Sequence, residues 1–393
     1  MICACTSGPQ HQSLETAVDA PATAADTESQ DSTDRVQRPS PGHTDLVQSV
    51  DISADGAFVA SAGVDGLVKV WDVETRRVLA EFEHHCEDPH GEPSVYSVAL
   101  SADASQVAVA CTSEVRLWMT EGPDEPRTIE VVGTDDAPSR YAVEFGPKAA
   151  RIATVSWEKN GHGVRVWDVE SGRLEADISG YGPVAFSPDG ASIAVNVEKP
   201  ADEMSDKEKR TIALNALLTP RYQNRVALYD LEIESRRMEL EGRALADDDI
   251  TFDQTGSLVA ATNGSTVTVW DTSTGEPKVS TTVDLTGSAP WSSGEAILTV
   301  AFGPDGDDVY VASQSGSISR IALSSGAIEA RYSRPIKWGS GDEVVRPVDH
   351  ADLFYFREKM FQMSPDARRL VSAPGGATVF VWDVESGQRR TLE

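Results

Sequence analysis

The chain has 393 residues, a net charge of −29 and 40% hydrophobic residues. Its length fits two or three ordinary domains or a single all-β domain. The excess of acidic side chains disfavours nucleic acid and anionic membranes as partners, and no run is apolar over the roughly 18 positions that a membrane-spanning helix needs.

Residues 1 to about 40 are rich in Ala, Thr, Ser, Asp and Gln. Such a stretch buries too little apolar surface to offset its chain entropy, so it is predicted to be a disordered acidic tail. It begins "MICACTSGPQHQ", without the basic and sustained apolar regions of a signal peptide, and no export is expected. The chain contains four cysteines, including Cys3 and Cys5 in the tail, which is too few for a disulfide framework. These features predict a protein of the reducing cytoplasm.

From about residue 41 the sequence becomes periodic, with two sets of seven related segments. Strand-like segments with apolar residues two apart are VKVWDVET (68–75), VRLWMTEG (115–122), VRVWDVES (164–171), VALYDLEI (226–233), VTVWDTST (267–274), ISRIALSS (318–325) and VFVWDVES (379–386). They are preceded by turn segments SADG (53–56), SADA (101–104), GPKA (146–149), SPDG (187–190), DQTG (253–256), GPDG (303–306) and SPDA (364–367). A fixed repeat of this kind indicates stacked structural units.

With these motifs the chain resembles the WD40 repeat family. The first repeat matches the family's hydrogen-bonded residues with His43, Ser61, Asp65 and Trp71. The resemblance implies a seven-bladed β-propeller of four-stranded antiparallel blades over residues 41–393. The expected blades are 44–83, 94–132, 140–178, 182–241, 248–284, 296–332 and 358–393. Scarce lysine and the idioms FSPDG and FGPDG resemble bacterial WD40 chains.

Some copies depart from the motif, with Met119 for Asp, Tyr229 for Trp, and Ile321–Ala322 for the Trp–Asp pair. The repeated phrase is interpreted as structural: its Trp is expected to pack between blades and its Asp to order a turn. Arg320 occupies the place of a valine or leucine in the other copies, and an interblade salt bridge is the structural account of it, with a role facing a ligand as the alternative.

The copies differ in length, and the extra residues all fall between the second and third strands of a blade (b–c) or between blades (d–a). Successive antiparallel strands reverse direction, so these connections share one face of the ring. The segments are 84–93, 133–139, 157–163, 198–224, 285–295 and 334–357. Long loops gathered on one face predict a binding surface.

Within the insertion at 205–220, Ser205 and Glu208 form a capping box and Pro220 ends the segment, which predicts a helix over 205–219. That helix packs either on the propeller or on a partner. Trp, Tyr and Arg dominate interfaces, so the candidate partner-binding residues are Trp338, Arg346, Tyr222, Tyr355 and Trp291. Phe354 and Phe356 have a competing interpretation as buried residues at the start of an innermost strand.

The d–a segment EHHCEDPHGE offers a weak metal site formed by His84, His85, Cys86 and His90, although its spacing matches no standard site. The aligned copies show no set of inward carboxylates or histidines, and no motif of catalysis or of cofactor binding stands in register with a strand and a helix. The sequence therefore predicts a non-catalytic, monomeric scaffold that binds a protein partner and needs no cofactor. The alternative is a propeller enzyme, or a sensor of small molecules or metals, that uses the channel mouth.

Two segments compete to close the last blade. Residues 388–392 follow the final hairpin directly, whereas 34–39 occupy the position from which many family members donate that strand. The C-terminal segment is favoured because closing a short loop costs less entropy.

Overall fold

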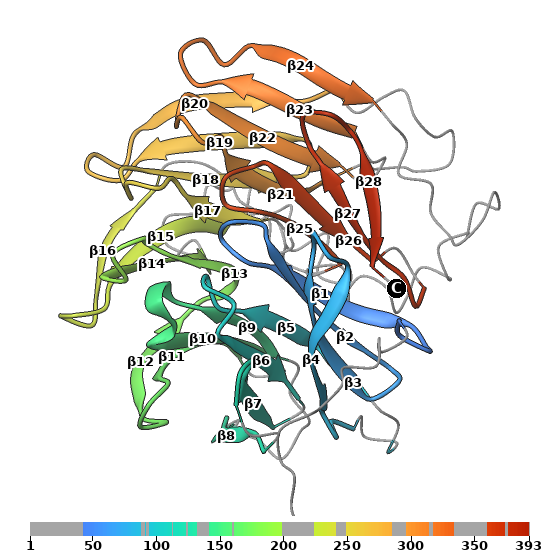
Figure 1. Ribbon diagram of the computed structural model, residues 1–393. Coiled ribbons are helices and arrows are strands. Elements are labelled where there is room, and N and C mark those ends of the chain that lie inside the picture. Colours follow the sequence, from blue (N-terminus) through green and yellow to red (C-terminus); the bar gives the residue numbers. More distant parts are fainter. Residues whose placement is uncertain are drawn as a thin grey trace, which may run out of the picture. The chain divides into compact units, whose positions relative to one another are not determined.

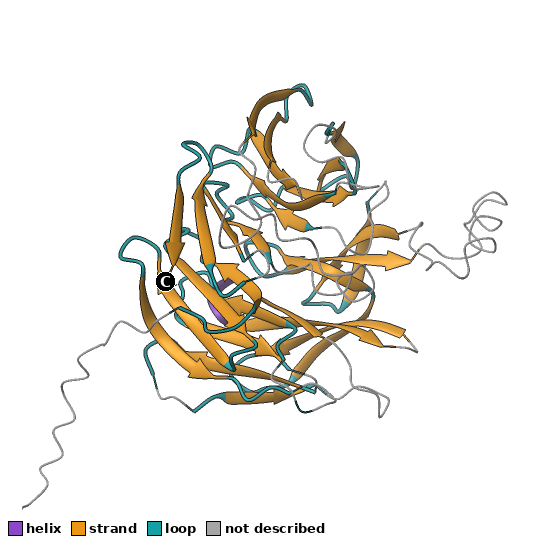
Figure 2. Ribbon diagram, turned by 90° about the vertical axis from the view of Figure 1, so that its right-hand side faces the viewer, coloured by secondary structure: helices purple, strands orange, loops and turns teal. Residues whose placement is uncertain are grey.

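The structure is a computed structural model that describes residues 42–87, 91, 94–111, 113–122, 125–131, 141–158, 161–198, 224–240, 249–284, 296–313, 317–333, 360–373 and 376–392. Within these residues the regular structure is strand, apart from one short 3-10 helix at Pro147–Ala149 (Figure 2). No helix in the described part of the chain has the length and apolarity needed to cross a bilayer.

The strands form seven four-stranded antiparallel sheets, each built from four consecutive strands. The first strands (a) are β1 (Val47–Ile52), β5 (Ser97–Leu100), β9 (Tyr141–Phe145), β13 (Tyr181–Phe186), β17 (Ile250–Phe252), β21 (Ile297–Phe302) and β25 (Phe361–Met363). The second strands (b) are β2 (Phe58–Gly63), β6 (Gln106–Ala110), β10 (Arg151–Glu158), β14 (Ser192–Glu198), β18 (Leu258–Asn263), β22 (Asp308–Ser313) and β26 (Arg369–Ser372). The third strands (c) are β3 (Leu67–Asp72), β7 (Glu114–Met119), β11 (Gly161–Asp168), β15 (Asn224–Asp230), β19 (Thr266–Asp271), β23 (Ser317–Ala322) and β27 (Val379–Asp383). The fourth strands (d) are β4 (Arg77–Glu83), β8 (Arg127–Glu130), β12 (Leu174–Ser179), β16 (Ser235–Glu239), β20 (Pro277–Thr282), β24 (Ile328–Ser333) and β28 (Arg389–Leu392).

The sheets close into a ring through their first strands. Each a strand contacts the a strand of the next blade, and β25 contacts β1 (Figure 1). This arrangement confirms the predicted seven-bladed β-propeller. Blade 7 takes its fourth strand from the C-terminus, because β28 pairs with β27 from Trp382–Arg389 to Val379–Leu392. The prediction that residues 388–392 close the ring is therefore confirmed.

The repeated Trp packs between blades, as expected. Trp71 is fully buried in a cluster that contains Val50 and Val59 of its own blade and Val371 and Val381 of blade 7. Alternation along the strands sends one apolar set toward each neighbouring blade, so every blade has two buried faces. A blade therefore needs both of its neighbours to bury its core.

The repeated Asp of the phrase orders the turn between strands c and d. In blade 3 the backbone N–H and the hydroxyl of Ser171 both donate to Asp168 Oδ1, and Ser386 does the same to Asp383 in blade 7. These hydrogen bonds lower the pKa of Asp168. The interpretation of this Asp as a turn residue is confirmed.

The first Ser of the a–b turn stabilises that turn by hydrogen bonds within it. Ser53 donates its hydroxyl hydrogen to Asp55 Oδ1 at 2.7 Å and accepts the N–H of Phe58 at 2.9 Å. The fourth turn residue has a positive φ, +68° at Gly56, where glycine avoids the steric cost of a Cβ. Ser, Asp and Gly together set the short a–b hairpin.

Side chains on the a strands also bind the backbone of the next blade. The Val98 N–H donates to Ser49 Oγ at 2.9 Å, and the Leu100 N–H donates to Asp51 Oδ2 at 2.8 Å. Further round the ring, the Val300 N–H donates to Asp249 Oδ2 at 2.9 Å. These contacts fix the vertical position of one blade against the next.

Arg320 differs from its expected setting. Its guanidinium pairs with Asp308 at 2.6 Å and with Glu329 at 3.5 Å, and both partners belong to its own blade. The side chain is 37% exposed, so the charge keeps contact with water. The predicted interblade salt bridge is wrong, because Asp308 on β22 and Glu329 on β24, the two strands beside β23, pair with Arg320.

Candidate functional site

The residues matched to the WD40 pattern in blade 1 form a continuous hydrogen-bonded chain. Asp65 accepts from His43 Nδ1 at 2.9 Å and from the Thr44 N–H at 3.0 Å. His43 Nε2 lies 2.7 Å from Ser61 Oγ, and Trp71 Nε1 donates to the same oxygen at 2.8 Å. With Nδ1 protonated, the Ser61 hydroxyl donates to Nε2 and accepts from the indole, so every polar atom is used.

This Ser–His–Asp order is also the order of a hydrolase triad, but its setting is structural. Ser61 is fully buried and its oxygen accepts the Trp71 N–H, which leaves no approach for a substrate. Burial lowers the pKa of His43 and outweighs the raising effect of Asp65, so the imidazole is neutral near pH 7. This series of hydrogen bonds links His43, which precedes β1, to the second and third strands of blade 1.

The channel side of the a strands encloses a cavity of about 450 Å³. Asp51 and Glu144 line it from equivalent places in blades 1 and 3, and Asp249 lines it from blade 5. The expectation that aligned copies show no inward carboxylates is therefore wrong for these positions. The repeated motif does not reveal these carboxylates, because they lie outside it, on an a strand or just before one.

The carboxyl group of Asp249 has a raised pKa. Burial raises its pKa to about 6, against the lowering effect of hydrogen bonds from Val300 and Thr299, and the charge of Glu144 raises it further. Thr299 Oγ1 donates to Oδ2 at 2.8 Å and the Ile250 N–H donates to Oδ1 at 2.9 Å. The carboxyl group of Asp249 thus accepts hydrogen bonds from both blade 5 and blade 6.

Two of the carboxylates of the cavity, those of Asp51 and Asp249, thus hold neighbouring blades together. Asp51 Oδ1 accepts the N–H of Ile52 while Oδ2 accepts that of Leu100. Among the residues that the structure describes, no group of three or more His, Cys, Asp or Glu side chains is placed to hold a metal ion. The cavity offers shape and negative charge, without an assembled catalytic set.

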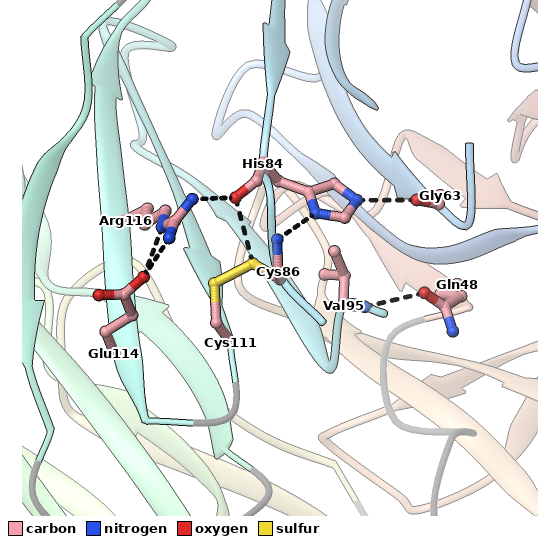
Figure 3. Close-up of a disulfide and its surroundings, with 8 residues drawn as sticks. All are labelled: Gln48, Gly63, His84, Cys86, Val95, Cys111, Glu114 and Arg116. Atoms are coloured by element: carbon pink, nitrogen blue, oxygen red, sulfur yellow. Dashed lines mark hydrogen bonds and ion pairs between the residues drawn. A yellow bond between two sulfur atoms is a disulfide. The ribbon is translucent and has the colours of Figure 1, made fainter. Parts of the chain in front are cut away.

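Two of the four candidate metal ligands, His84 and Cys86, bond to other groups of the protein (Figure 3). Cys86 forms a disulfide with Cys111, so its sulfur is no thiolate ligand. His84 is buried with both ring nitrogens used: Nε2 donates to the Gly63 carbonyl at 2.9 Å, and Nδ1 accepts the Cys86 N–H at 3.0 Å. His85 is largely exposed and lies 3.3 Å from Glu83, while His90 lies outside the described residues. The ring nitrogens of His84 and the sulfur of Cys86 are thus engaged within the protein.

The disulfide pairs two of the four cysteines, which their number alone did not indicate. Four cysteines in 393 residues indicated a reduced protein, but Cys86 and Cys111 are brought together with their Cα atoms 5.2 Å apart. Their separation of 25 residues carried no recognisable motif. Only the pairing of blade 1 with blade 2 reveals the bond.

The connections have unequal lengths on the two faces of the ring. Those between strands a and b have one short length, at 53–57, 101–105, 146–150, 187–191, 253–257, 303–307 and 364–368. The b–c connection of blade 4 spans 199–223, and the d–a connections that precede blades 6 and 7 span 283–296 and 334–360. We call the face from which the b–c and d–a connections emerge the long-connection face.

The predicted partner-binding residues all belong to these long connections. Trp338, Arg346, Tyr222, Tyr355 and Trp291 lie outside the described residues, as do the expected helix at 205–219 and Phe354 and Phe356. The structure places the strands that flank each segment. The roles of these side chains remain predictions.

Residues 35–72 match the WD40 family model, described as "WD domain, G-beta repeat". The chain is 30% identical over 137 residues to the small ribosomal subunit protein RACK1 of Candida albicans, covering 33% of this chain and 38% of that protein. It is 23% identical over 226 residues to the transcriptional corepressor LEUNIG_HOMOLOG of Arabidopsis thaliana, covering 57% and 24%. It is 28% identical over 99 residues to the methylosome protein WDR77 of Xenopus laevis, covering 25% and 28%.

The matched regions span about a quarter to two fifths of the length of these relatives. Two of these relatives are named as proteins of an assembly, the small ribosomal subunit and the methylosome. All three are eukaryotic, so they give no support to the expected bacterial type. Their similarity agrees with the propeller that the sheets form.

Proposed function

We propose that this chain is a non-catalytic scaffold that docks a protein partner on the long-connection face. The observation that carries the proposal is the unequal length of the connections. The blade 4 insertion at 199–223 and the segment at 334–360 leave the same face of the ring, while the opposite face keeps short hairpins. Long connections on a rigid scaffold are the usual place of recognition.

The hydrogen-bonded polar residues of blade 1 and of the channel support a structural role better than a catalytic one. Ser61, His43 and Asp65 are bound to one another and to Trp71, out of reach of a substrate. Asp249 in the channel is bound to the backbone of its neighbouring blade. The channel-mouth enzyme or sensor therefore has no described set of groups that favours it.

The relatives support the same class of function. Two of them are named as proteins of an assembly, the small ribosomal subunit and the methylosome, and the third is named as a transcriptional corepressor. The net charge of −29 favours a protein over a nucleic acid as the partner of this chain. The insertions at 198–224 and 334–357 are close to neutral in sequence, so we expect a largely apolar contact that responds weakly to salt.

The test is a binding measurement with a partner captured by the full chain. Trp338→Ala should weaken binding about tenfold or more, because aromatic anchors dominate interface energies. Its thermal midpoint should fall by no more than about 3 °C. Arg346→Ala and Tyr222→Ala should have smaller effects.

The matched control is Asp305→Asn, an exposed position in the short a–b connection 303–307 of blade 6. This substitution should leave affinity unchanged. Loss of binding in Asp305→Asn together with full binding by Trp338→Ala would place the interface on the opposite face and contradict the proposal.

A further inference from the structure

The disulfide crosses the boundary between two blades. Cys86 follows β4, the last strand of blade 1, and Cys111 follows β6, the second strand of blade 2. Their Cα atoms lie 5.2 Å apart, within the range that a disulfide spans. The bond therefore joins blade 1 covalently to blade 2 on the long-connection face.

The surroundings of the bond belong to the packed interface of the same two blades. Phe82 of blade 1 stacks on Trp118 of blade 2 with ring centroids 5.5 Å apart. Arg116 of blade 2 donates to the carbonyl of His84 at 2.5 Å (Figure 3). Both cysteines are less than 5% exposed, so a small thiol reagent reaches them only after this interface opens.

The other side of blade 1 is closed without a covalent bond. The Val47 N–H donates to the Gly376 carbonyl at 2.9 Å, and Arg369 of blade 7 donates to the Gly56 carbonyl at 2.6 Å. The fourth strand of blade 7 is its own β28, so blades 1 and 7 share no strand. The described residues thus hold the boundary between blades 7 and 1 by hydrogen bonds, an ion pair and apolar packing.

We propose that Cys86 and Cys111 form a native disulfide that staples blade 1 to blade 2, and that the chain folds where a thiol oxidant is available. The oxidant is a small-molecule disulfide such as oxidised glutathione. The two protein thiols give up two protons and two electrons, one S–S bond forms in the protein, and the glutathione disulfide becomes two thiols. Because both sulfurs are buried, the exchange takes place before the interface between blades 1 and 2 closes. This inference is independent of where a partner docks.

The test uses the full chain carrying Cys3→Ala and Cys5→Ala, so that only Cys86 and Cys111 remain to react. After refolding with oxidised glutathione, the denatured protein should show no free thiol, and reduction should raise its mass by about 2 Da for the two hydrogens gained. Free thiols in the refolded protein would overturn the proposal.

The role of the staple is measured on the same protein by hydrogen–deuterium exchange. Reduction should lower the thermal midpoint by about 4 °C, as expected from cross-linking a loop of this size in a large domain. Exchange of the most protected amides of β2 and β3 in blade 1 should accelerate about tenfold or more, because reduction destabilises the ring that blade 1 completes. Equal protection of blade 1 before and after reduction would overturn the staple.

A matched variant removes the cysteines themselves. Cys86→Ala with Cys111→Ala should have the lower midpoint of the reduced protein and should not respond to reductant. A further fall of its midpoint on reduction would contradict the assignment. If this variant does not fold, the comparison of oxidised and reduced Cys3→Ala/Cys5→Ala protein decides the question alone.

Discussion

At the scale of single residues, Ser61 shows how one hydroxyl serves two buried partners. The equivalent hydroxyl in blade 7, at Ser372, accepts the N–H of Trp382 at 3.1 Å. In blade 1 the hydroxyl also bonds His43, which is itself bonded to Asp65. Loss of Ser61 would leave an indole N–H and an imidazole nitrogen unsatisfied in the core.

We therefore expect Ser61→Ala to lower the free energy of unfolding by about 3 kcal/mol, since each buried unsatisfied polar group costs about 1–3 kcal/mol. Ser372→Ala, which removes one bond to a partly buried Trp, should cost about 1 kcal/mol. Urea unfolding of both variants measures the difference. Equal costs would show that His43 does not depend on Ser61.

At the scale of elements, Asp249 links blade 5 to blade 6, and the pKa of its carboxyl group is raised to about 6. A buried acid of this kind holds its proton more tightly in the folded state than in the unfolded state. Its contribution to stability is therefore greatest below the unfolded pKa of about 4 and declines as the pH rises through about 6. The direction is opposite to that of a salt-bridged carboxylate.

Asp249→Asn should remove this pH dependence. Between about pH 4 and pH 7, the unfolding free energy of the wild type should fall relative to that of the variant by on the order of 3 kcal/mol, the equivalent of the shift. Chemical unfolding across that pH range is the measurement. Asp253→Asn, which alters an aspartate in the adjoining a–b turn, is the control for replacing a nearby carboxylate, and parallel curves for wild type and Asp249→Asn would contradict the assignment.

The strands and turns were predictable because their determinants are local. Alternation in segments such as VRVWDVES and the turn residues that precede them act within a single hairpin, and they gave the seven blades and the C-terminal closure. Contacts between side chains of neighbouring strands and of neighbouring blades were not predictable in the same way. The Cys86–Cys111 bond and the Arg320–Asp308 pair depend on which residues lie opposite each other once the sheets form.

Part of the candidate site was likewise predictable from the sequence, and part was not. The sequence located the long connections, whose flanking strands the structure describes, because insertion length is visible in the repeat. It missed the channel carboxylates Asp51, Glu144 and Asp249, since they lie on an a strand or just before one, outside the repeated phrase. Their common signal was available in the sequence as an acidic residue shortly before an a–b turn segment.

At the scale of the whole molecule, the ring depends on contacts between the first and last blades. Leu392 of β28 is 1% exposed and belongs to a cluster with Val47 and Val50 of blade 1 and Val381 of blade 7. The last residues of the described chain thus bury apolar surface against the first strand. Because each blade needs both neighbours, damage at this boundary should destabilise the whole ring.

Leu392→Ala should lower the free energy of unfolding by about 2–4 kcal/mol, the cost of a cavity left by a buried leucine. Leu174→Ala is the control, because Leu174 lies on β12, also a fourth strand, but is 40% exposed; it should cost less than about 1 kcal/mol. Hydrogen exchange of the most protected amides in β2 and β18 should accelerate together in Leu392→Ala, since both report opening of one cooperative ring. Faster exchange confined to blades 7 and 1, with β18 unchanged, would show that blades open independently and that closure at Leu392 does not govern the stability of the propeller.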